Sequence, residues 1–462
     1  MLEAMLMRTT KTQRHGVTAL LAMIFLVLFA TLAVGFYASI TQTTVIATNE
    51  KNGTISLTAA ESGMDFVRYQ LALIKVPPTV PVDQTFDYLA VHLQDALEAS
   101  PNLGGRRVAV SSTGVSIPAS PDQYIQLDNS GSAFHATLEK VGANVRVKTT
   151  GRFISAVASD RAVQMDYQRT QVNTTIYNYA VAAQGGVIMQ KGSVGASGGA
   201  PASIASVMSA KGSAPAIRVN GGTIGGDLSV ISNGFASVTG GSVGGSTIVP
   251  DIIARHTHVI DPPDFPYVDT NYFKQYAVNT YSDGSILKNM RIPANTNPKF
   301  TGGATIQGIL YIESPNTVEF RGDVNLAGFI VFENKNTSSV NIIDMRGNFS
   351  QTPLPLDSDF DNLRGISGIS VLAPTTRMVI SGSVDSYLLG NVILGTFSNG
   401  ASADWTIDKG SVVAMDQYSD AAVFNGKTVK FTATGQYNMP SAGLRYSSYF
   451  KPQGSTYDEV KP

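Results

Sequence analysis

The chain has 462 residues, a formal net charge of −1 at pH 7 and no cysteine. Its length leaves room for two or three domains. Only 15% of the residues are charged, which is below the usual share of about a quarter, and the near-zero balance argues against nucleic-acid binding or a polybasic membrane surface. The lack of cysteine excludes disulfides and thiol chemistry, so stability must come from core packing.

The N-terminal region contains an uncharged apolar run from Val17 to Ala38. At about 1.5 Å per residue the run spans roughly 33 Å, enough for a hydrocarbon core of about 30 Å. Arg8, Lys11 and Arg14 precede it, and the positive-inside rule then places the N-terminus in the cytoplasm. We therefore predict a single-pass membrane anchor with a stripe formed by Val17, Leu21, Phe25, Leu28, Leu32 and Phe36. A cleaved secretory signal, whose apolar region is shorter, and a buried soluble helix are the alternatives.

The helix is expected to continue beyond the bilayer. No proline occurs between Thr41 and Lys75, and Pro77 and Pro78 would end the helix. One apolar stripe recurs at helical spacing, and charged residues fall on the other side. The stripe consists of Met64, Val67, Leu71 and Ile74, and the charged residues are Glu50, Lys51, Glu61, Asp65 and Arg68. A helix that is half apolar and half amphipathic is typical of filament-forming subunits.

Two motifs in this helix resemble those of a known family. Arg14-His15-Gly16, followed by Val17-Thr18-Ala19-Leu20-Leu21, is similar to the class III signal of type IV pilins and pseudopilins. Thr58-Ala59-Ala60-Glu61-Ser62-Gly63 is similar to a block in PilX-type minor pilins. The resemblance covers about residues 8–75. It implies that a prepilin peptidase cuts between Gly16 and Val17, so that residues 1–16 form a cytoplasmic leader and 17–76 the assembly helix.

One position departs from the family pattern. Most pilins carry a glutamate at the fifth position of the mature chain, where it pairs with a neighbouring N-terminal amine, and this chain has Leu21 there. The same departure is found in PilX-type proteins and in the K-type minor pseudopilin of type II secretion. The resemblance therefore implies a minor subunit at a tip or in initiation rather than a major, self-polymerising one, and the departure leaves cleavage at Gly16 open.

Residues 79–180 predict a small α+β domain. Phe86 to Ala99 reads as an amphipathic helix, and short alternating stretches follow at 108–110, 115–117, 134–138, 145–148 and 162–167. A long helix followed by an antiparallel meander is the usual arrangement of a pilin head. An unrelated α+β domain on a membrane stalk is the alternative.

The region 185–445 is rich in glycine and repeats itself. Val219 to Gly226 matches Val238 to Gly245 at a spacing of 19 residues. The apolar segments starting at Gly308 and Gly328 are 20 apart, and so are those starting at Gly390 and Gly410. β-rich units of this length predict the rungs of a parallel β-helix, with glycine in the turns and valine or isoleucine stacked inside. A glycine linker followed by a β-sandwich is the alternative.

Two further segments interrupt or follow the repeat. Residues 250–300 contain six prolines, including the phrase Asp261-Pro-Pro-Asp-Phe-Pro-Tyr267, and are expected to form an excursion on the side of the solenoid. Residues 446–462 are expected to form a cap or tail.

Little in the sequence points to chemistry, because no P-loop, nucleophile elbow or dinucleotide fingerprint is present. His256 and His258 are weak candidates for a metal site, with Asp251, Asp261 and Asp264 nearby in sequence. Carboxylates and arginine of the kind used by polysaccharide-cleaving β-helices are also present, namely Asp344, Arg346, Asp357, Asp359 and Asp361. Nothing marks them as convergent, and Trp405 is the single tryptophan. We expect no catalytic residue and no cofactor.

The expected protein is mainly β, with a long N-terminal transmembrane α-helix, a pilin-like α+β segment and a C-terminal parallel β-helix. The leading hypothesis is a structural component of a type IV pilus-related or type II secretion-like filament system. It would sit in a bacterial inner membrane with most of the chain periplasmic or extracellular. Its expected partners are membrane lipid, other pilin-like subunits or assembly proteins, and polysaccharide. The alternative is a membrane-tethered β-helix that binds or degrades cell-envelope polysaccharide.

Overall fold

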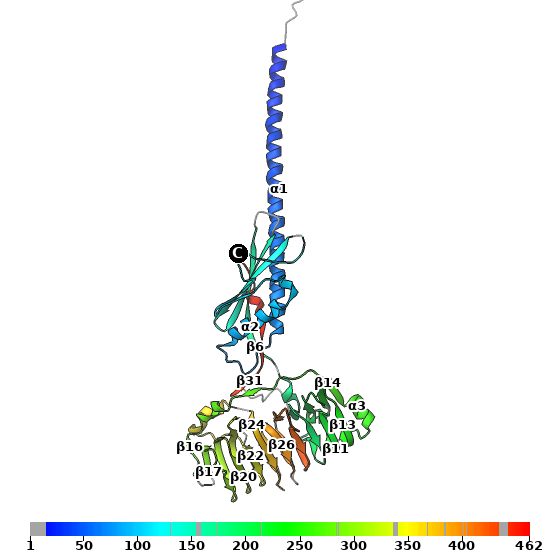
Figure 1. Ribbon diagram of the computed structural model, residues 1–462, viewed down its shortest axis with the longest axis vertical. Helices are drawn as coiled ribbons and strands as arrows, with labels where there is room; N and C mark the ends of the chain where they lie inside the picture. Colours follow the sequence, from blue (N-terminus) through cyan, green and yellow to red (C-terminus); the bar gives the residue numbers. More distant parts are fainter. Residues whose placement is uncertain are drawn as a thin grey trace, which may run out of the picture. The chain divides into compact units, whose positions relative to one another are not determined.

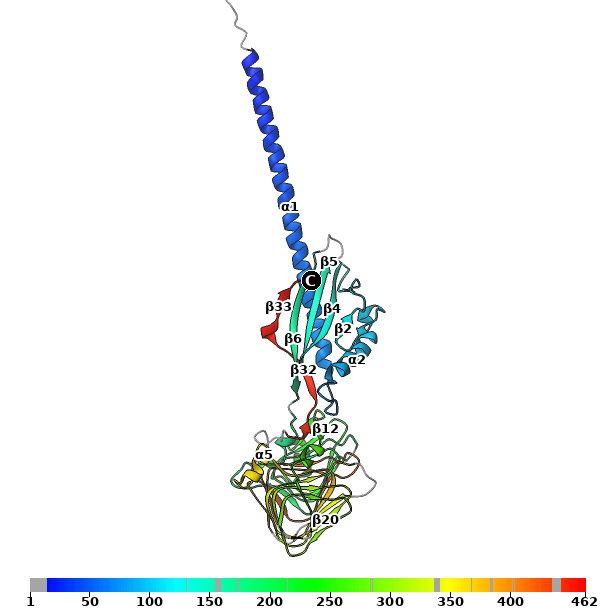
Figure 2. The ribbon, with the colours of Figure 1, turned by 90° about the vertical axis from the view of Figure 1, so that its left-hand side faces the viewer.

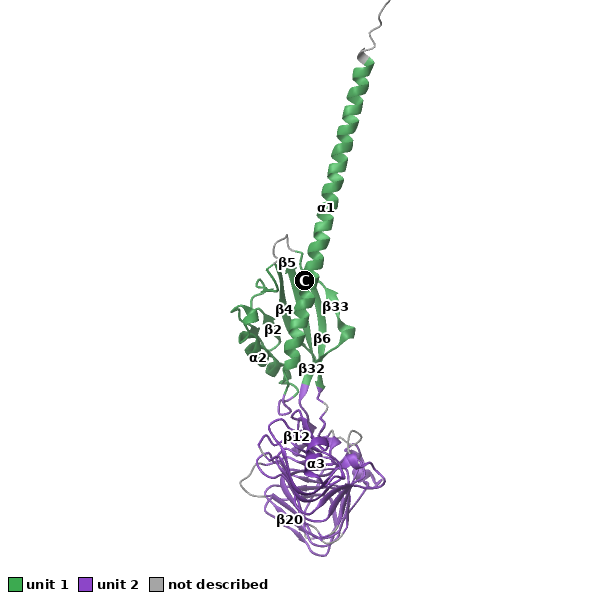
Figure 3. Ribbon diagram, turned by 90° about the vertical axis from the view of Figure 1, so that its right-hand side faces the viewer, with its two compact units in different colours: residues 1–76, 82–170, 449–462 green, residues 77–81, 171–448 purple. Residues whose placement is uncertain are grey.

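The computed structural model describes residues 15–462, apart from 130, 154–158, 173, 214, 283, 285, 336–340, 367, 383–384, 401, 403 and 434–441. The chain divides into two compact units, coloured separately in Figure 3. Unit 1 comprises 1–76, 82–170 and 449–462, and unit 2 comprises 77–81 and 171–448.

Helix α1 (His15–Leu73) is 59 residues long and forms the long blue helix of Figure 1. No proline occurs within it, and it stops shortly before Pro77 and Pro78, whose rings cannot continue a helix. The predicted apolar stripe is confirmed, because Met64, Val67 and Leu71 are at most 3% exposed. The charged residues expected on the other side of the helix are exposed.

An antiparallel sheet packs against the C-terminal half of α1, and Figure 2 shows its central strands side by side. The sheet order is β1-β2-β4-β5-β6-β32, with β3 on β4 and β33 on β6. Helix α2 (Thr85–Glu98) buries its apolar side in the same unit. The strands are β1 (Ala109–Val110), β2 (Gly114–Ile117), β3 (Ile125–Gln126), β4 (Ser132–Val141), β5 (Asn144–Phe153), β6 (Arg161–Gln171), β32 (Ser448–Pro452) and β33 (Asp458–Val460).

The last strands of the chain return to unit 1. Strand β33 pairs antiparallel with β6, with Asp458 opposite Gln164. Arg161 and Glu459 form an ion pair across this pairing, with 3.1 Å between guanidinium and carboxylate. Unit 1 is thus completed by residues more than 270 positions downstream of its other strands, and unit 2 is an insertion between β6 and β32.

Unit 2 is a three-sided parallel β-solenoid, which confirms the predicted fold class. Its strands stack into three ladders in which every pairing is parallel. The first ladder runs β14 (Thr257–Ile260), β12 (Leu228–Ile231), β10 (Val207–Ser209), β7 (Val181–Ala183), β28 (Val412–Ala414), β26 (Asn391–Asn399), β24 (Ile369–Ile380), β21 (Val324–Phe332), β19 (Ala304–Ile312), β17 (Ile286–Ile292), β16 (Asn279–Thr280).

The other two ladders share several of these strands, because a long strand turns a corner and contributes to two faces. The second runs β13 (Ala236–Val243), β11 (Ile217–Ile224), β8 (Val187–Met189), β29 (Ala422–Phe424), β26, β24, β22 (Asn341–Met345), β20 (Thr317–Phe320), β18 (Lys299–Phe300). The third runs β13, β11, β9 (Ser193–Ala196), β30 (Thr428–Phe431), β27 (Trp405–Asp408), β25 (Ser386–Leu389), β23 (Phe349–Thr352), β21, β19, β17.

The sequence repeats coincide with the strand register. Val219 pairs with Val238, Gly308 with Gly328, and Val392 with Val412. Gly308 and Gly328 both have positive φ, and a Cβ on Gly328 would lie 1.8 Å from the carbonyl oxygen of Gly308. Only glycine therefore fits this corner, because a side chain would collide with the backbone of the neighbouring rung.

The stacking order of the rungs differs from their order in the chain. The first rung (β7, β8, β9) pairs with the last one (β28, β29, β30), so the two ends of the repeat region meet in the middle of the stack. Figure 1 shows this as green strands beside orange ones. The outermost rungs come from the middle of the sequence, with β13 and β14 at one end and β16 to β18 at the other.

Residues 261–278, which we call the strap, join these two outermost rungs. The strap holds β15 (Tyr267–Val268), paired with β31 (Leu444–Arg445), and the short helix α4 (Asn271–Lys274). Its Val268 and Phe273 are buried against outward-facing side chains of the first ladder, such as Tyr311. The first ladder is therefore apolar on both faces, and α5 (Asp361–Arg364) adds Leu363 to the same outer cluster.

The inside of the solenoid is a continuous apolar core. Four aromatic rings form a row within it, from Phe300 through Phe320 and Phe349 to Trp405, with neighbouring centroids 5.1 to 6.4 Å apart. The first and last pairs are stacked, and the middle pair meets edge to face. At the β14 end, helix α3 (Val249–Arg255) covers the core with Ile252, which is fully buried.

Candidate functional site

The N-terminal half of α1 presents its apolar side chains to the outside. Val17, Leu21, Phe25, Leu28, Leu32 and Phe36, the predicted anchor stripe, are each between 47% and 70% exposed. Among the described residues, α1 is the one helix long and apolar enough to cross a membrane. Exposure of this much apolar surface is unfavourable in water. This half of α1 is therefore a candidate membrane anchor.

The exposed half of α1 is longer than an anchor needs to be. Every residue from 17 to 51 is exposed, and the packed half begins at Asn52. This length is about 52 Å at 1.5 Å per residue, which exceeds a hydrocarbon core by roughly 20 Å. The excess, residues 39–51, is rich in threonine and still exposes Ile40, Val45 and Ile46 by at least half.

The C-terminal half of α1 is held against β4 and β5 by close backbone contact. A Cβ on Gly151 of β5 would lie 2.0 Å from the carbonyl oxygen of Ser56, and a Cβ on Gly63 would lie 2.6 Å from the ring of Phe134. The Thr149 hydroxyl donates a 2.8 Å hydrogen bond to the carbonyl oxygen of Ala60. The small residues of the Thr58–Gly63 block thus form the packing face of the helix.

Tyr167 of β6 completes this interface from the sheet side. It is fully buried, and its hydroxyl donates to the sulfur of Met64 at 3.7 Å. Burial raises the pKa of Tyr167 to about 12, because the phenolate would be desolvated. The side chain therefore stays neutral and packs as part of the core.

The predicted processing site lies at the beginning of α1. Gly16 and Val17 are both within the helix, and Leu21 lies in its exposed part. Residues 1–14 of the expected leader, including Arg8, Lys11 and Arg14, lie outside the described residues. Cleavage at Gly16 stays a prediction.

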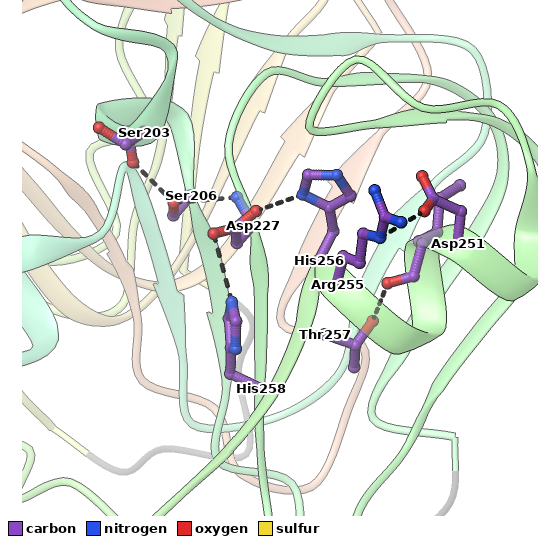
Figure 4. A network of polar contacts seen from close by, with 9 residues as sticks. Ser203, Ser206, Asp227, Asp251, Arg255, His256, Thr257 and His258 are labelled. Atoms are coloured by element: carbon purple, nitrogen blue, oxygen red, sulfur yellow. Dashed lines mark hydrogen bonds and ion pairs between the residues drawn. The ribbon is translucent and has the colours of Figure 1, made fainter.

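The two histidines flagged by the sequence share one carboxylate that the sequence did not suggest. Figure 4 shows Asp227, which precedes β12, between them. Its Oδ1 lies 2.7 Å from Nδ1 of His256, and its Oδ2 lies 3.3 Å from Nε2 of His258. Partial burial raises the pKa of Asp227, but the hydrogen bonds from the two imidazoles outweigh burial, and the net shift is downward.

The aspartates expected near these histidines do not join them. Asp251 pairs with Arg255 at 3.1 Å within α3, and Asp261 and Asp264 lie in the strap. Within the described ranges, no group of three histidine or acidic side chains is arranged to hold a metal ion. Asp227 lies 29 residues before His256 and meets it only because Leu228 pairs with Thr257 in adjacent rungs.

The candidate carboxylates of the solenoid are all engaged in ion pairs with basic side chains. Asp344 accepts from Nε of Arg346 at 2.8 Å on β22. Asp357 and Asp359 both contact Lys288, and Asp361 pairs with Arg364. Trp405 is buried in the core, where its ring stacks on Phe349, so it offers no exposed ring to a sugar.

Comparison with known proteins gives distant likeness among solved structures. No protein-family model matches the chain, and no curated protein matches it. Among solved structures, the chain is similar to the competence-associated pilin ComZ from Thermus thermophilus. The identity is 11% and the TM-score 0.23, over 88% of this chain and 97% of that chain. A likeness of this degree carries no argument about function, which must come from the structure described above.

Proposed function

We propose that the protein is a minor pilin-like or pseudopilin-like component of a type IV pilus-related or type II secretion-like filament system. In this role it is a structural subunit rather than an enzyme, anchored in a bacterial inner membrane with its N-terminus in the cytoplasm. Other pilin-like subunits surround α1, and the solenoid is displayed outside the cytoplasm.

The observation that carries the proposal is the excess length of the exposed half of α1. A simple anchor needs about 20 apolar residues, and its domain can begin directly at the membrane surface. Here residues 39–51 lie between the apolar run and the packed half, with Ile40, Val45 and Ile46 exposed. Neighbouring helices in a filament would cover these side chains, whereas a monomeric anchor leaves them in water.

A charged side chain introduced into residues 39–51 distinguishes a filament subunit from a monomeric anchor. We expect Ile46→Lys, at a side chain 50% exposed, to leave membrane insertion and folding intact but to abolish co-purification of pilin-like subunits from detergent. Val91→Lys is the matched control, because Val91 is 48% exposed on α2, away from α1's exposed half. Equal co-purification by both variants, or none by the wild type, would contradict the proposal.

Processing at Gly16 is tested by mass spectrometry of the mature N-terminus, in cells with and without the prepilin peptidase. The expected result is a chain beginning at Val17 only when the peptidase is present. An intact Met1 in both samples would contradict processing.

A further inference from the structure

A polar cleft lies at the β16–β18 end of the solenoid, between the end of the strap, strand β17 and helix α5. It has a volume of about 360 Å³, which is at the lower end of the range of small-molecule sites. Its lining combines four carboxamides with Lys288, Asp359 and the ring of Tyr276. The carboxamides are Gln275, Asn279, Asn289 and Asn362. All these residues belong to unit 2.

Hydrogen bonds within the protein fix two of the carboxamides and leave their oxygens as acceptors. Gln275 donates from Nε2 to the carbonyl oxygen of Tyr272 at 2.9 Å. Asn279 donates from Nδ2 to the carbonyl oxygen of Lys288 at 2.7 Å. Among the described contacts, Oε1 of Gln275 and Oδ1 of Asn279 have no donor. The exposed side chain of Asn362 adds a further amide, so the cleft suits a ligand with several hydroxyl donors.

A buried side chain sets the shape of the cleft floor. Asn289 is 7% exposed and has a positive φ of 43°. Its Oδ1 accepts from the amide of Ile309 at 3.3 Å, and its Nδ2 donates to the carbonyl oxygen of Asp359 at 3.2 Å. These bonds join β17, β19 and the turn before α5, so the floor is rigid before any ligand arrives.

The charge of the cleft selects among hydroxylated ligands. Lys288 is flanked by Asp359 and by Asp357, whose Oδ2 lies 3.7 Å from Nζ. Two carboxylates around one ammonium leave a local charge of −1, which repels acidic sugars and phosphates. Tyr276 and Val278 add the apolar contact that the C–H face of a sugar ring needs.

We propose that this cleft binds an uncharged saccharide of one or two rings. The carboxamide oxygens of Gln275 and Asn279 accept its hydroxyl protons, Asn362 contributes a further amide, and Tyr276 packs against the ring. The proposal concerns unit 2 and does not depend on whether α1 enters a filament.

The test uses the full chain in a detergent without a sugar headgroup, and saturation-transfer NMR with four probes. Cellobiose and N,N′-diacetylchitobiose are the uncharged probes, glucuronic acid is the acidic one and spermidine the cationic one. We expect saturable binding of at least one uncharged probe and none of glucuronic acid or spermidine. Binding of neither uncharged probe, or tighter binding of a charged one, would overturn the proposal.

Variants then locate the binding. Gln275→Ala and Asn362→Ala remove exposed amides, and each is expected to raise the Kd at least tenfold. Asn325→Ala is the matched control, because Asn325 is an exposed asparagine lining a separate, more open groove on the third ladder. An equal loss of affinity in Asn325→Ala, or none in the two cleft variants, would place the ligand elsewhere and overturn the assignment.

Discussion

Helix α1 is continuous, but its first half is exposed and its second half packs against the rest of unit 1. Residues 17–51 expose their apolar side chains, whereas Met64, Val67 and Leu71 in the second half are buried against the sheet of unit 1. The difference lies in side-chain size and pattern. Residues 17–38 of the first half are uncharged and apolar all round, and the second half has one stripe and small residues where β5 comes close. An all-round apolar helix needs lipid or other helices, and a striped one needs a single partner surface.

The largest expected effect comes from replacing a leucine by alanine in the packed half of α1. The same replacement in the exposed half is the comparison. Leu71→Ala removes a fully buried side chain, so the free energy of opening of β4 and β5 should fall by about 2–5 kcal/mol. Leu28→Ala, at a side chain 51% exposed, should leave that free energy unchanged. Hydrogen exchange of the full chain, read on peptides from β4 and β5, measures both. A similar loss in both variants would show that the halves are not independent.

The second prediction concerns pH. Tyr167 has its pKa raised to about 12, whereas an unfolded tyrosine titrates near 10, so the neutral phenol contributes stability in full below pH 10. That contribution should decline between pH 10 and about 12, by roughly 3 kcal/mol in total. Tyr167→Phe cannot ionise, so the difference in opening free energy between wild type and variant should shrink over this range. A constant difference would contradict burial of the phenol against Met64.

The third prediction compares two glycines of α1. Gly63→Ala introduces a Cβ 2.6 Å from the ring of Phe134, and the overpacking should cost about 1–3 kcal/mol. Gly35→Ala places a Cβ where nothing lies within 4 Å. It should leave the sheet unchanged and raise helicity, since alanine favours the helix by about 1 kcal/mol. Hydrogen exchange on β4 and helicity by circular dichroism distinguish the two, and a stabilised Gly63→Ala would contradict the tight packing.

The smallest expected effect comes from a side-chain hydrogen bond that ties β5 to the block in α1. Thr149→Val keeps the shape of the side chain but leaves the carbonyl oxygen of Ala60 without its 2.8 Å donor. The opening free energy should fall by about 1 kcal/mol, the net contribution of a typical intramolecular hydrogen bond. Thr137→Val on β4 is the control, since Thr137 is only partly buried and pairs through its backbone. Equal changes in opening free energy in the two variants would mean that β-propensity, rather than this hydrogen bond, determines the change.

Much of each local element could be predicted from sequence. The apolar run, the stripe from Met64 to Ile74 and the rung spacing all depend on residues close together in the chain. The candidate site could be predicted less completely from the sequence. His256 and His258 were visible, but their partner Asp227 comes from another rung. The cleft residues Gln275, Lys288 and Asn362 are spread over nearly 90 positions and carry no shared motif.

By itself, the sequence determined a long helix with an apolar first half, an α+β segment and a solenoid with rungs of 19 to 20 residues, because periodicity encodes each of these locally. Only the tertiary structure decided how the pieces are ordered. The first rung pairs with the last, the strap joins the outermost rungs, and β33 completes the sheet of unit 1. All rungs share one inward apolar pattern, so their sequences do not specify which rung lies next to which. That choice depends on side-chain packing between segments far apart in the chain.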